Sequence, residues 1–219
     1  MKICFKKVFL MCALLASAAT AAVAQQTTSG DEGGKNEFSF WGGFSPDSNT
    51  FIKATGRTPD ARFGIVNFRY ARRFNNSDSV NLKYTADFTP FAALNYPDFN
   101  YVQTGTSVFR AVSATRPTRY AFGISPLGLQ ANFRPRKKTQ PFVDATGGFL
   151  YFNKRTPNVV GTRFAFTADI GGGIEYQMKG GRSVTFGYKY FHISNGNRGQ
   201  ENPGFDNNLF YVGYTFLKK

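Results

Sequence analysis

Val184–Ser194 has the sequence VTFGYKYFHIS, and its strict alternation decides the fold of the chain. Counted by twos, one face of this stretch is apolar and aromatic and then ends in polar residues: Val184, Phe186, Tyr188, Tyr190, His192 and Ser194. A period of two is that of a β-strand, in which successive side chains point to opposite faces. The stretch is therefore a strand with one apolar face. The only histidine of the chain and a serine lie on that face.

The same alternation recurs in seven other segments. In the segment at 118–133 the apolar phase shifts at Pro126, which predicts a bulge or kink there. Many aromatic residues, with 25 Phe and 11 Tyr, and an aromatic C-terminal strand are typical of outer-membrane barrels. We predict an all-β fold, an eight-stranded antiparallel transmembrane β-barrel. The seven other segments lie at about 36–44, 61–72, 80–89, 118–133, 140–153, 161–178 and 208–217.

The apolar faces of these strands are expected to contact lipid, because an eight-stranded barrel is just wide enough to hold its own interior side chains. The inward set mixes both charges and is predicted to pair internally rather than line a pore. A soluble, lipocalin-like barrel with its apolar face inside is the alternative. The inward charged residues are Glu37, Arg69, Lys83, Asp87, Asp144, Asp169, Glu175 and Lys189.

The lengths of the connections predict the orientation of the barrel. The second, fourth and sixth connections are short, the first, third and seventh are long, and the fifth is intermediate. The third, at about 93–117, reads as a long polar and aromatic loop. Short turns face the periplasm in this class. His192 and Ser194 are therefore expected at the outer-leaflet end of one barrel domain, residues 36–219.

The N-terminus reads as an export signal, residues 1–24, with a basic start, an apolar run and the cleavage site Ala22-Val23-Ala24. A signal anchor is the alternative. Residues 25–35, QQTTSGDEGGK, are predicted to be a flexible leader. Both cysteines, Cys4 and Cys12, lie in the signal, so the mature protein has no disulfide and no cysteine-based metal site. We expect no cofactor and no metal.

The chain is basic, with a formal net charge of +14. Export and the absence of a Lys/Arg cluster on one helix argue against nucleic acid as the partner. An anionic membrane surface is the expected partner.

His192 and Ser194 could act together as base and nucleophile. Two residues along a strand span about 7 Å, and side chains that lean together can reach hydrogen-bond distance. The imidazole could then take the proton of the hydroxyl, and a third group would hold its tautomer. Asp206 is the candidate acid, because the returning hairpin brings it beside the end of the previous strand. Glu201 in the loop is the rival acid.

The motif His192-Ile193-Ser194-Asn195, followed by Asn202-Pro203-Gly204 and an aromatic strand, resembles the lipid A 3-O-deacylases of the PagL type. Further similarity lies in the segments Gly123–Leu129 and Pro141–Tyr151. The resemblance covers mainly residues 118–216. It implies an eight-stranded outer-membrane barrel with a Ser-His-Glu triad on its outer wall, which removes the ester-linked acyl chain at position 3 of lipid A.

By the motif, Ser194 matches the nucleophile of that family, His192 the base and Asn195 a residue of the oxyanion hole. Backbone N–H groups at the Gly196 turn are further oxyanion donors. The acid position falls on Asp206, where the family has Glu. Asp is one methylene shorter, so either the strands lie closer or another group such as Glu201 orients His192.

The expected substrate is lipid A, or lipopolysaccharide, in the outer leaflet. Arginines of the external loops could meet its phosphates: Arg198 and, more weakly, Arg110, Arg116 and Arg119. Two other functions stay open, a non-catalytic structural barrel and a phospholipase or acyltransferase that uses the same serine. The oligomeric state is open between a monomer and a homodimer.

Overall fold

The computed structural model of the protein describes residues 35–48, 58, 60–103, 109–200, 202 and 204–218. The expected signal, residues 1–24, and nearly all of the expected leader lie outside them. The described ranges hold no helix long and apolar enough to cross a membrane. Their strands are β1 (Asn36–Ser45), β2 (Arg62–Arg73), β3 (Val80–Asn95), β4 (Asp98–Gln103), β5 (Phe109–Thr115), β6 (Thr118–Phe133), β7 (Thr139–Thr156), β8 (Thr162–Gln177), β9 (Ser183–Ser194) and β10 (Phe205–Lys218).

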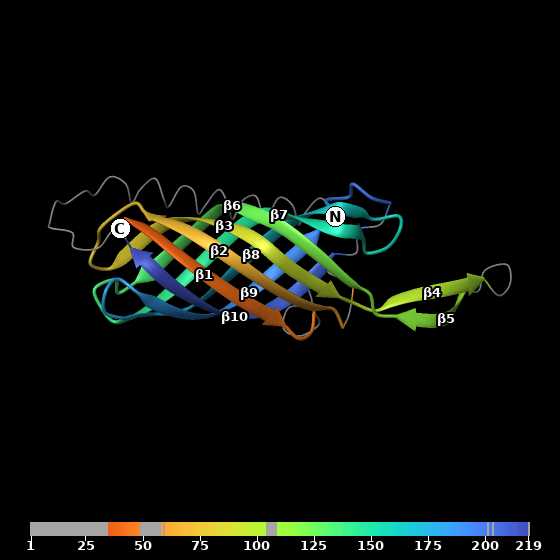
Figure 1. Ribbon diagram of the computed structural model, residues 1–219, viewed down its shortest axis with the longest axis horizontal. Helices are drawn as coiled ribbons and strands as arrows, with labels where there is room; N and C mark the ends of the chain where they lie inside the picture. The colour runs from red at the N-terminus through yellow and green to blue at the C-terminus, as the bar shows by residue number, and fades with distance from the viewer. Residues whose placement is uncertain are drawn as a thin grey trace.

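Eight of these strands close into an antiparallel barrel in the order β1-β10-β9-β8-β7-β6-β3-β2 (Figure 1). They are the eight strands that the alternation predicts. The phase shift at Pro126 is also confirmed, because the pairing of β6 with β7 slips between Ile124 and Leu127. Ser125 is buried inside the barrel, whereas Leu127 is 72% exposed on its outer wall.

The connection between β3 and β6 differs from the predicted loop. β4 and β5 pair with each other in a separate two-stranded sheet and form a hairpin that extends beyond one end of the barrel (Figure 1). Phe99, Tyr101 and Val102 in β4 belong to the aromatic and β-branched types that favour strands. Part of the segment that was expected to be a loop therefore forms two strands, β4 and β5, which pair with each other.

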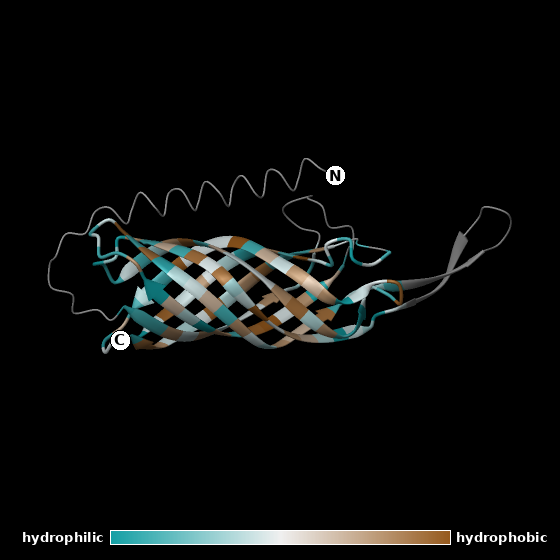
Figure 2. Cartoon of the chain, turned by 90° about the horizontal axis from the view of Figure 1, so that it is seen from above, coloured by the Kyte–Doolittle hydropathy of each residue, from teal (hydrophilic) through white to brown (hydrophobic). Residues whose placement is uncertain are grey.

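The outer wall of the barrel is apolar, and hydrophobic and hydrophilic residues alternate along its strands (Figure 2). Phe122 and Phe186 are each 57% exposed on this wall. In a water-soluble barrel these faces would point into the core. The lipocalin-like alternative is therefore wrong, and the barrel presents its apolar face to its surroundings.

One half of the barrel interior is filled by ion pairs, as predicted. Arg69 contacts Asp87 at 2.7 and 2.8 Å and Asp144 at 3.3 Å. Lys189 contacts Asp144 at 2.7 Å and Asp169 at 2.6 Å. These five residues, named here the central cluster, are at most 8% exposed. Buried charges of both signs pair with each other, as the sequence predicts.

A second group of ion pairs lies toward the start of β1 and the end of β10. Lys83 contacts Glu37 at 2.8 Å and Glu175 at 3.4 Å. Lys218, which the alternation did not mark as an inward residue, contacts Glu175 at 3.0 Å. Every inward charged residue that the sequence marked thus takes part in an ion pair inside the barrel.

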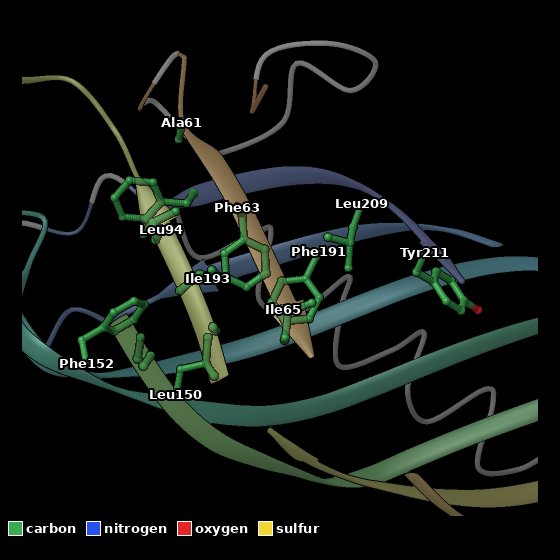
Figure 3. Close-up of a cluster of buried hydrophobic side chains, with 14 of the residues drawn as sticks. Ala61, Phe63, Ile65, Leu94, Leu150, Phe152, Phe191, Ile193, Leu209 and Tyr211 are labelled. Atoms are coloured by element: carbon green, nitrogen blue, oxygen red, sulfur yellow. The ribbon is translucent and has the colours of Figure 1, made fainter. Parts of the chain in front are cut away.

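The other half of the interior is apolar, which the sequence did not predict (Figure 3). Phe191 and Ile193 of β9 point into it and are 2% and 1% exposed. The ring of Phe191 lies 5.2 Å from that of Phe63. Further members are Ile65, Leu94, Leu150, Phe152, Phe205 and Leu209. The end of β9 is therefore anchored from inside by close apolar packing.

The two ends of the barrel differ in their connections. The turns at 74–79, 134–138 and 178–182 are short, and they lie at the end that holds the C-terminus of β10 (Figure 1). The opposite end, named here the long-loop end, carries the hairpin of β4 and β5 and the β9–β10 loop, residues 195–204. β9 runs toward the long-loop end, which brings His192 and Ser194 there.

Candidate active site

His192 and Asp206 form a close pair across two neighbouring strands. They are direct partners in the register of β9 with β10, and His192 Nδ1 lies 2.5 Å from Asp206 Oδ1. A carboxylate only accepts hydrogen bonds, so the Nδ1–H of the imidazole donates. In the neutral ring the second nitrogen, Nε2, then lacks a proton and can act as a base.

The register explains how the short side chain of Asp206 reaches the histidine. Side chains directly opposite on antiparallel strands have Cβ atoms about 4.5–5.5 Å apart, so no extra methylene is required. β10 begins at Phe205, three residues before the predicted start, because it continues to pair with Ile193 of β9. Asp206 is thereby held inside a strand.

The Asp206 carboxylate is shielded although it lies on the outward face of β10. The residue is 4% exposed, and Asn208, two residues along the same face, is 3% exposed. The backbone N–H of Asn208 donates to Ser45 Oγ at 3.0 Å, and Thr58 Oγ1 donates to the carbonyl of Gly204 at 3.3 Å. Residues at both ends of the β1–β2 connection therefore lie against this part of β10. Shielding from water strengthens the interaction of the carboxylate with His192, whose side chain is 27% exposed.

Ser194 is the last residue of β9 and lies on the same face as His192. It is partly exposed, and its cross-strand partner in β8 is Phe166. Within the described residues no hydrogen bond joins the Ser194 hydroxyl to the imidazole. Catalytic hydrogen bonds are often long before substrate binds. The serine thus lies two residues along the strand, on the same face, from a histidine that an acid contacts.

Asn195 and Gly196 begin a tight turn after the serine. Gly196 and Asn197 have φ angles of 64° and 63°, and the N–H of Arg198 donates to the Asn195 carbonyl at 3.3 Å. Two consecutive positive φ angles are those of a type I′ turn. A Cβ on Gly196 would lie 2.9 Å from the ring of Phe166, so the position also requires glycine for space.

The side chain of Asn195 is oriented by this turn. The residue is 5% exposed, its Oδ1 accepts from the N–H of Asn197 at 2.9 Å, and its own N–H donates to Asn202 Oδ1 at 2.9 Å. Glu201 and Pro203 lie outside the described residues. The structure therefore brings Asp206 to His192 and leaves the rival acid Glu201 untested.

The predicted arginines separate into different environments. Arg198 stacks its guanidinium on the rings of Phe166 and Phe164, at 4.9 and 5.4 Å from their centroids, beside the serine. Arg116 donates to the Asp60 carbonyl at 2.6 Å and to Asn95 Oδ1 at 3.1 Å, so it braces the loops instead.

Arg119 lies near Tyr96, which is buried at the end of β3. Burial raises the pKa of Tyr96, and the Arg119 guanidinium partly offsets this shift. Arg110 falls in β5, where its side chain is outside the described part of the chain. Of the three predicted arginines whose side chains the structure describes, Arg198 is the one that contacts the surroundings of the serine.

Two further arginines near the site escaped sequence reasoning. Arg155 and Arg163 bracket the β7–β8 turn, residues 157–161, and line the same pocket as Arg198. Their sequence signal is a pair of arginines flanking a turn at the long-loop end. This signal is weak, because charged residues that flank a turn are usually only solvated.

The described residues contain no group of three or more His, Cys, Asp or Glu that could hold a metal ion.

A family model described as lipid A 3-O-deacylase (PagL) matches residues 78–215, well over half of the chain. The chain belongs to the PagL family. The matched range contains the three residues of the candidate site, His192, Ser194 and Asp206. No curated protein matches the chain.

One solved structure shows the same fold, and a second is reported beside it. The crystal structure of the outer membrane enzyme PagL is 14% identical, covers 81% of this chain and 97% of its own, and has a TM-score of 0.51. The crystal structure of Neisserial surface protein A is 8% identical, with 85% and 100% coverage and a TM-score of 0.48. Together with the family, the closed eight-stranded barrel identifies this protein as an integral outer-membrane β-barrel.

Proposed function

We propose that the protein is a serine esterase that removes the 3-O-linked acyl chain of lipid A in the outer leaflet. Ser194 is the nucleophile, His192 the base and Asp206 the acid that orients His192. The observation that carries this proposal is the 2.5 Å contact between His192 Nδ1 and Asp206 Oδ1, two residues from a serine on the same face. Membership of the PagL family supports the choice of lipid A as substrate.

The outward direction of the site supports catalysis over a structural role. Polar and ionisable side chains on a lipid-facing wall are costly and gain nothing from packing against lipid. A structural barrel would have apolar residues at these positions. This protein has apolar residues at Phe186 of β9 and Phe210 of β10, farther from the long-loop end. In this proposal His192 and Ser194 face the membrane at the level of the outer leaflet, which suits an ester that is itself embedded there.

The reaction proceeds in two acyl transfers. His192 Nε2 takes the proton of the Ser194 hydroxyl while Oγ attacks the ester carbonyl, and Asp206 stabilises the resulting imidazolium. The ester C–O bond then breaks, and His192 returns the proton to the sugar oxygen that leaves. Water, activated by the same Nε2, attacks the acyl-serine, frees the fatty acid and regenerates Ser194.

The tetrahedral intermediates need hydrogen-bond donors for their oxyanion. The N–H of Gly196 and the side-chain amide of Asn195 are the assigned donors, because both lie within two residues of the nucleophile and belong to the type I′ turn. Removing one oxyanion donor commonly lowers kcat by about 100-fold to 1000-fold.

The test compares the purified protein with its Ser194→Ala variant on lipid A and on phospholipid, with products followed by mass spectrometry. We expect the wild type to release one hydroxy-fatty acid from lipid A. Loss of the nucleophile should lower kcat by about a million-fold, to the limit of detection. Ser79→Ala, which removes an exposed hydroxyl at the opposite end of the barrel, is the matched control and should keep full activity.

The outcomes separate the candidate functions. Lipid A left intact by the folded wild type would rule out the deacylase and favour a structural barrel. Cleavage of phospholipid alone would favour a phospholipase, and transfer of the acyl group to another lipid would favour an acyltransferase. A fluorophosphonate probe adds a direct readout, because it should label the wild type and Ser79→Ala but not Ser194→Ala.

A further inference from the structure

A basic pocket of about 710 Å³ opens at the long-loop end of the barrel, beside the candidate active site. It lies between the β7–β8 turn and the β9–β10 loop. Arg155, Arg163 and Arg198 line it, and among the residues that the structure describes no Asp or Glu does. Its volume falls in the usual range for small-molecule sites, about 300–1000 Å³.

The walls of this arginine pocket are joined to each other. The N–H of Gln200 in the β9–β10 loop donates to the Val160 carbonyl in the β7–β8 turn at 3.2 Å. At Gly199 the two walls approach so closely that a Cβ would lie 3.0 Å from both the Val160 carbonyl oxygen and Asn195 Nδ2. The pocket is therefore formed before a ligand arrives, which lowers the cost of binding.

None of the three guanidinium groups forms an ion pair with an acid in the described part of the chain. Arg155 Nη1 reaches only the Val159 and Gly161 carbonyls, at 3.4 and 3.5 Å, and Arg198 rests on aromatic rings. Guanidinium groups match the tetrahedral oxygens of phosphate with paired N–H donors, and a cluster of them favours a doubly charged anion.

The position of the pocket connects it to the serine. Arg198 lies over Phe166, and Phe166 is the direct partner of Ser194 on the neighbouring strand. Neighbouring strands are about 4.8 Å apart, so the pocket and the nucleophile belong to one continuous surface. An amphiphile whose ester meets Ser194 on the apolar wall would hold its charged headgroup at the rim, where the arginines are.

We propose that the arginine pocket binds a phosphate monoester on the saccharide headgroup of the lipid whose acyl ester reaches Ser194. This inference rests on the proposed function. It identifies the phosphate as the group by which the substrate is positioned. The pocket selects lipids that carry a phosphate monoester on a sugar over phospholipids, whose phosphate is a diester with less charge.

The test measures binding in the Ser194→Ala background, where no turnover can occur. Calorimetry in detergent micelles gives the Kd for lipid A with both phosphates, for lipid A with its phosphates removed, and for phosphatidylglycerol. Adding Arg163→Gln should raise the Kd for phosphorylated lipid A by about 10-fold to 100-fold, as expected for a lost charge-assisted hydrogen bond. It should leave the Kd for dephosphorylated lipid A unchanged.

Two further variants complete the comparison. Lys154→Gln removes an exposed positive charge from the same end of β7 without touching the pocket, and it should bind like the parent. Arg155→Gln should repeat the effect of Arg163→Gln. Heat-dependent gel mobility reports whether each barrel has folded.

An equal Kd for both forms of lipid A, with or without Arg163, would overturn the pocket proposal. An equal loss with phosphatidylglycerol would overturn it as well, because the pocket would then not distinguish a monoester from a diester. The failure of the proposed function looks different. In that case the wild type would release no fatty acid, while the arginine-dependent binding of phosphorylated lipid A would remain.

Discussion

The two faces of the last six residues of β9 have opposite environments. Toward the interior, Lys189, Phe191 and Ile193 are at most 2% exposed and contact ion-pair partners or apolar side chains. Toward the outside, the side chain of His192 is 27% exposed, and Ser194 is partly exposed. One face therefore holds the strand in place, while the other presents polar groups that packing does not require.

The difference places the residues that stabilise β9 and the residues of the proposed site on separate faces of one strand. Contacts inside the barrel hold the backbone of β9 in place, so the side chains on its outer face project from a rigid strand. Sites on strands are held more accurately than sites on loops, which matters because a shift of about 1 Å can cost about 100-fold in rate. Substitutions on the two faces should accordingly change different measurements.

After the loss of Ser194 itself, the largest expected effect is on the outer face, at Asp206. Asp206→Asn keeps the shape of the side chain but presents an amide to His192, which favours the wrong tautomer. We expect kcat on lipid A to fall by about 10⁴-fold, with KM and the stability of the barrel nearly unchanged. Kinetics and a denaturant titration in detergent measure the two quantities separately.

Asp206→Glu is the matched control, because it keeps the charge and restores the residue type of the family pattern. It should retain far more activity than Asp206→Asn. A fall of less than tenfold in Asp206→Asn would show that another group, with Glu201 as the first candidate, orients His192. Comparing Glu201→Gln in the same assay would then decide between the two acids.

The next effect is on the inner face, at Lys189. Lys189→Met removes the ammonium that contacts Asp144 and Asp169 and leaves buried carboxylates without it. Breaking a buried pair in this way costs about 3–5 kcal/mol, so the free energy of unfolding should fall by that amount. The folded fraction should still cleave lipid A, because the outer face is untouched.

The double variant Lys189→Met/Asp169→Asn tests the cause of this loss. Neutralising one of the two acids should recover part of the stability lost in Lys189→Met. A loss below 1 kcal/mol in the single variant would mean that the central cluster contributes little to holding β9.

The smallest effect is expected at Ile193, which lies between His192 and Ser194 but points inward. Ile193→Val removes one buried methylene and should lower the free energy of unfolding by about 1 kcal/mol. If the two faces are independent, kcat should stay within about threefold of the wild type. A tenfold fall in kcat without unfolding would instead show that the apolar packing inside the barrel controls the position of Ser194.

Much of the fold follows from local patterns. The alternation around Lys83 or Lys189 marks which residues face inward, and the internal pairing of the set is predictable because an inward charge needs an opposite one. The slip at Pro126 was visible for the same reason, since a change of phase must be absorbed by a bulge. The outward direction of His192 and Ser194 required only counting by twos.

Other features depend on the register, which no single strand contains. That Asp206 lies directly opposite His192 depends on how β10 pairs with β9, and a slip of one residue would turn the carboxylate to the other face. The pairing of β4 with β5 and the meeting of Arg155, Arg163 and Arg198 also bring together segments whose separation in sequence carries no signal.

The sequence by itself thus determined the barrel, the inward and outward faces, and the outward position of Ser194 and His192, because a period of two is a property of each strand alone. The tertiary structure decided how far Asp206 lies from His192, which end of the interior is apolar, and where the arginines gather. These are relations between strands, and cross-strand packing fixes them only once the barrel has closed.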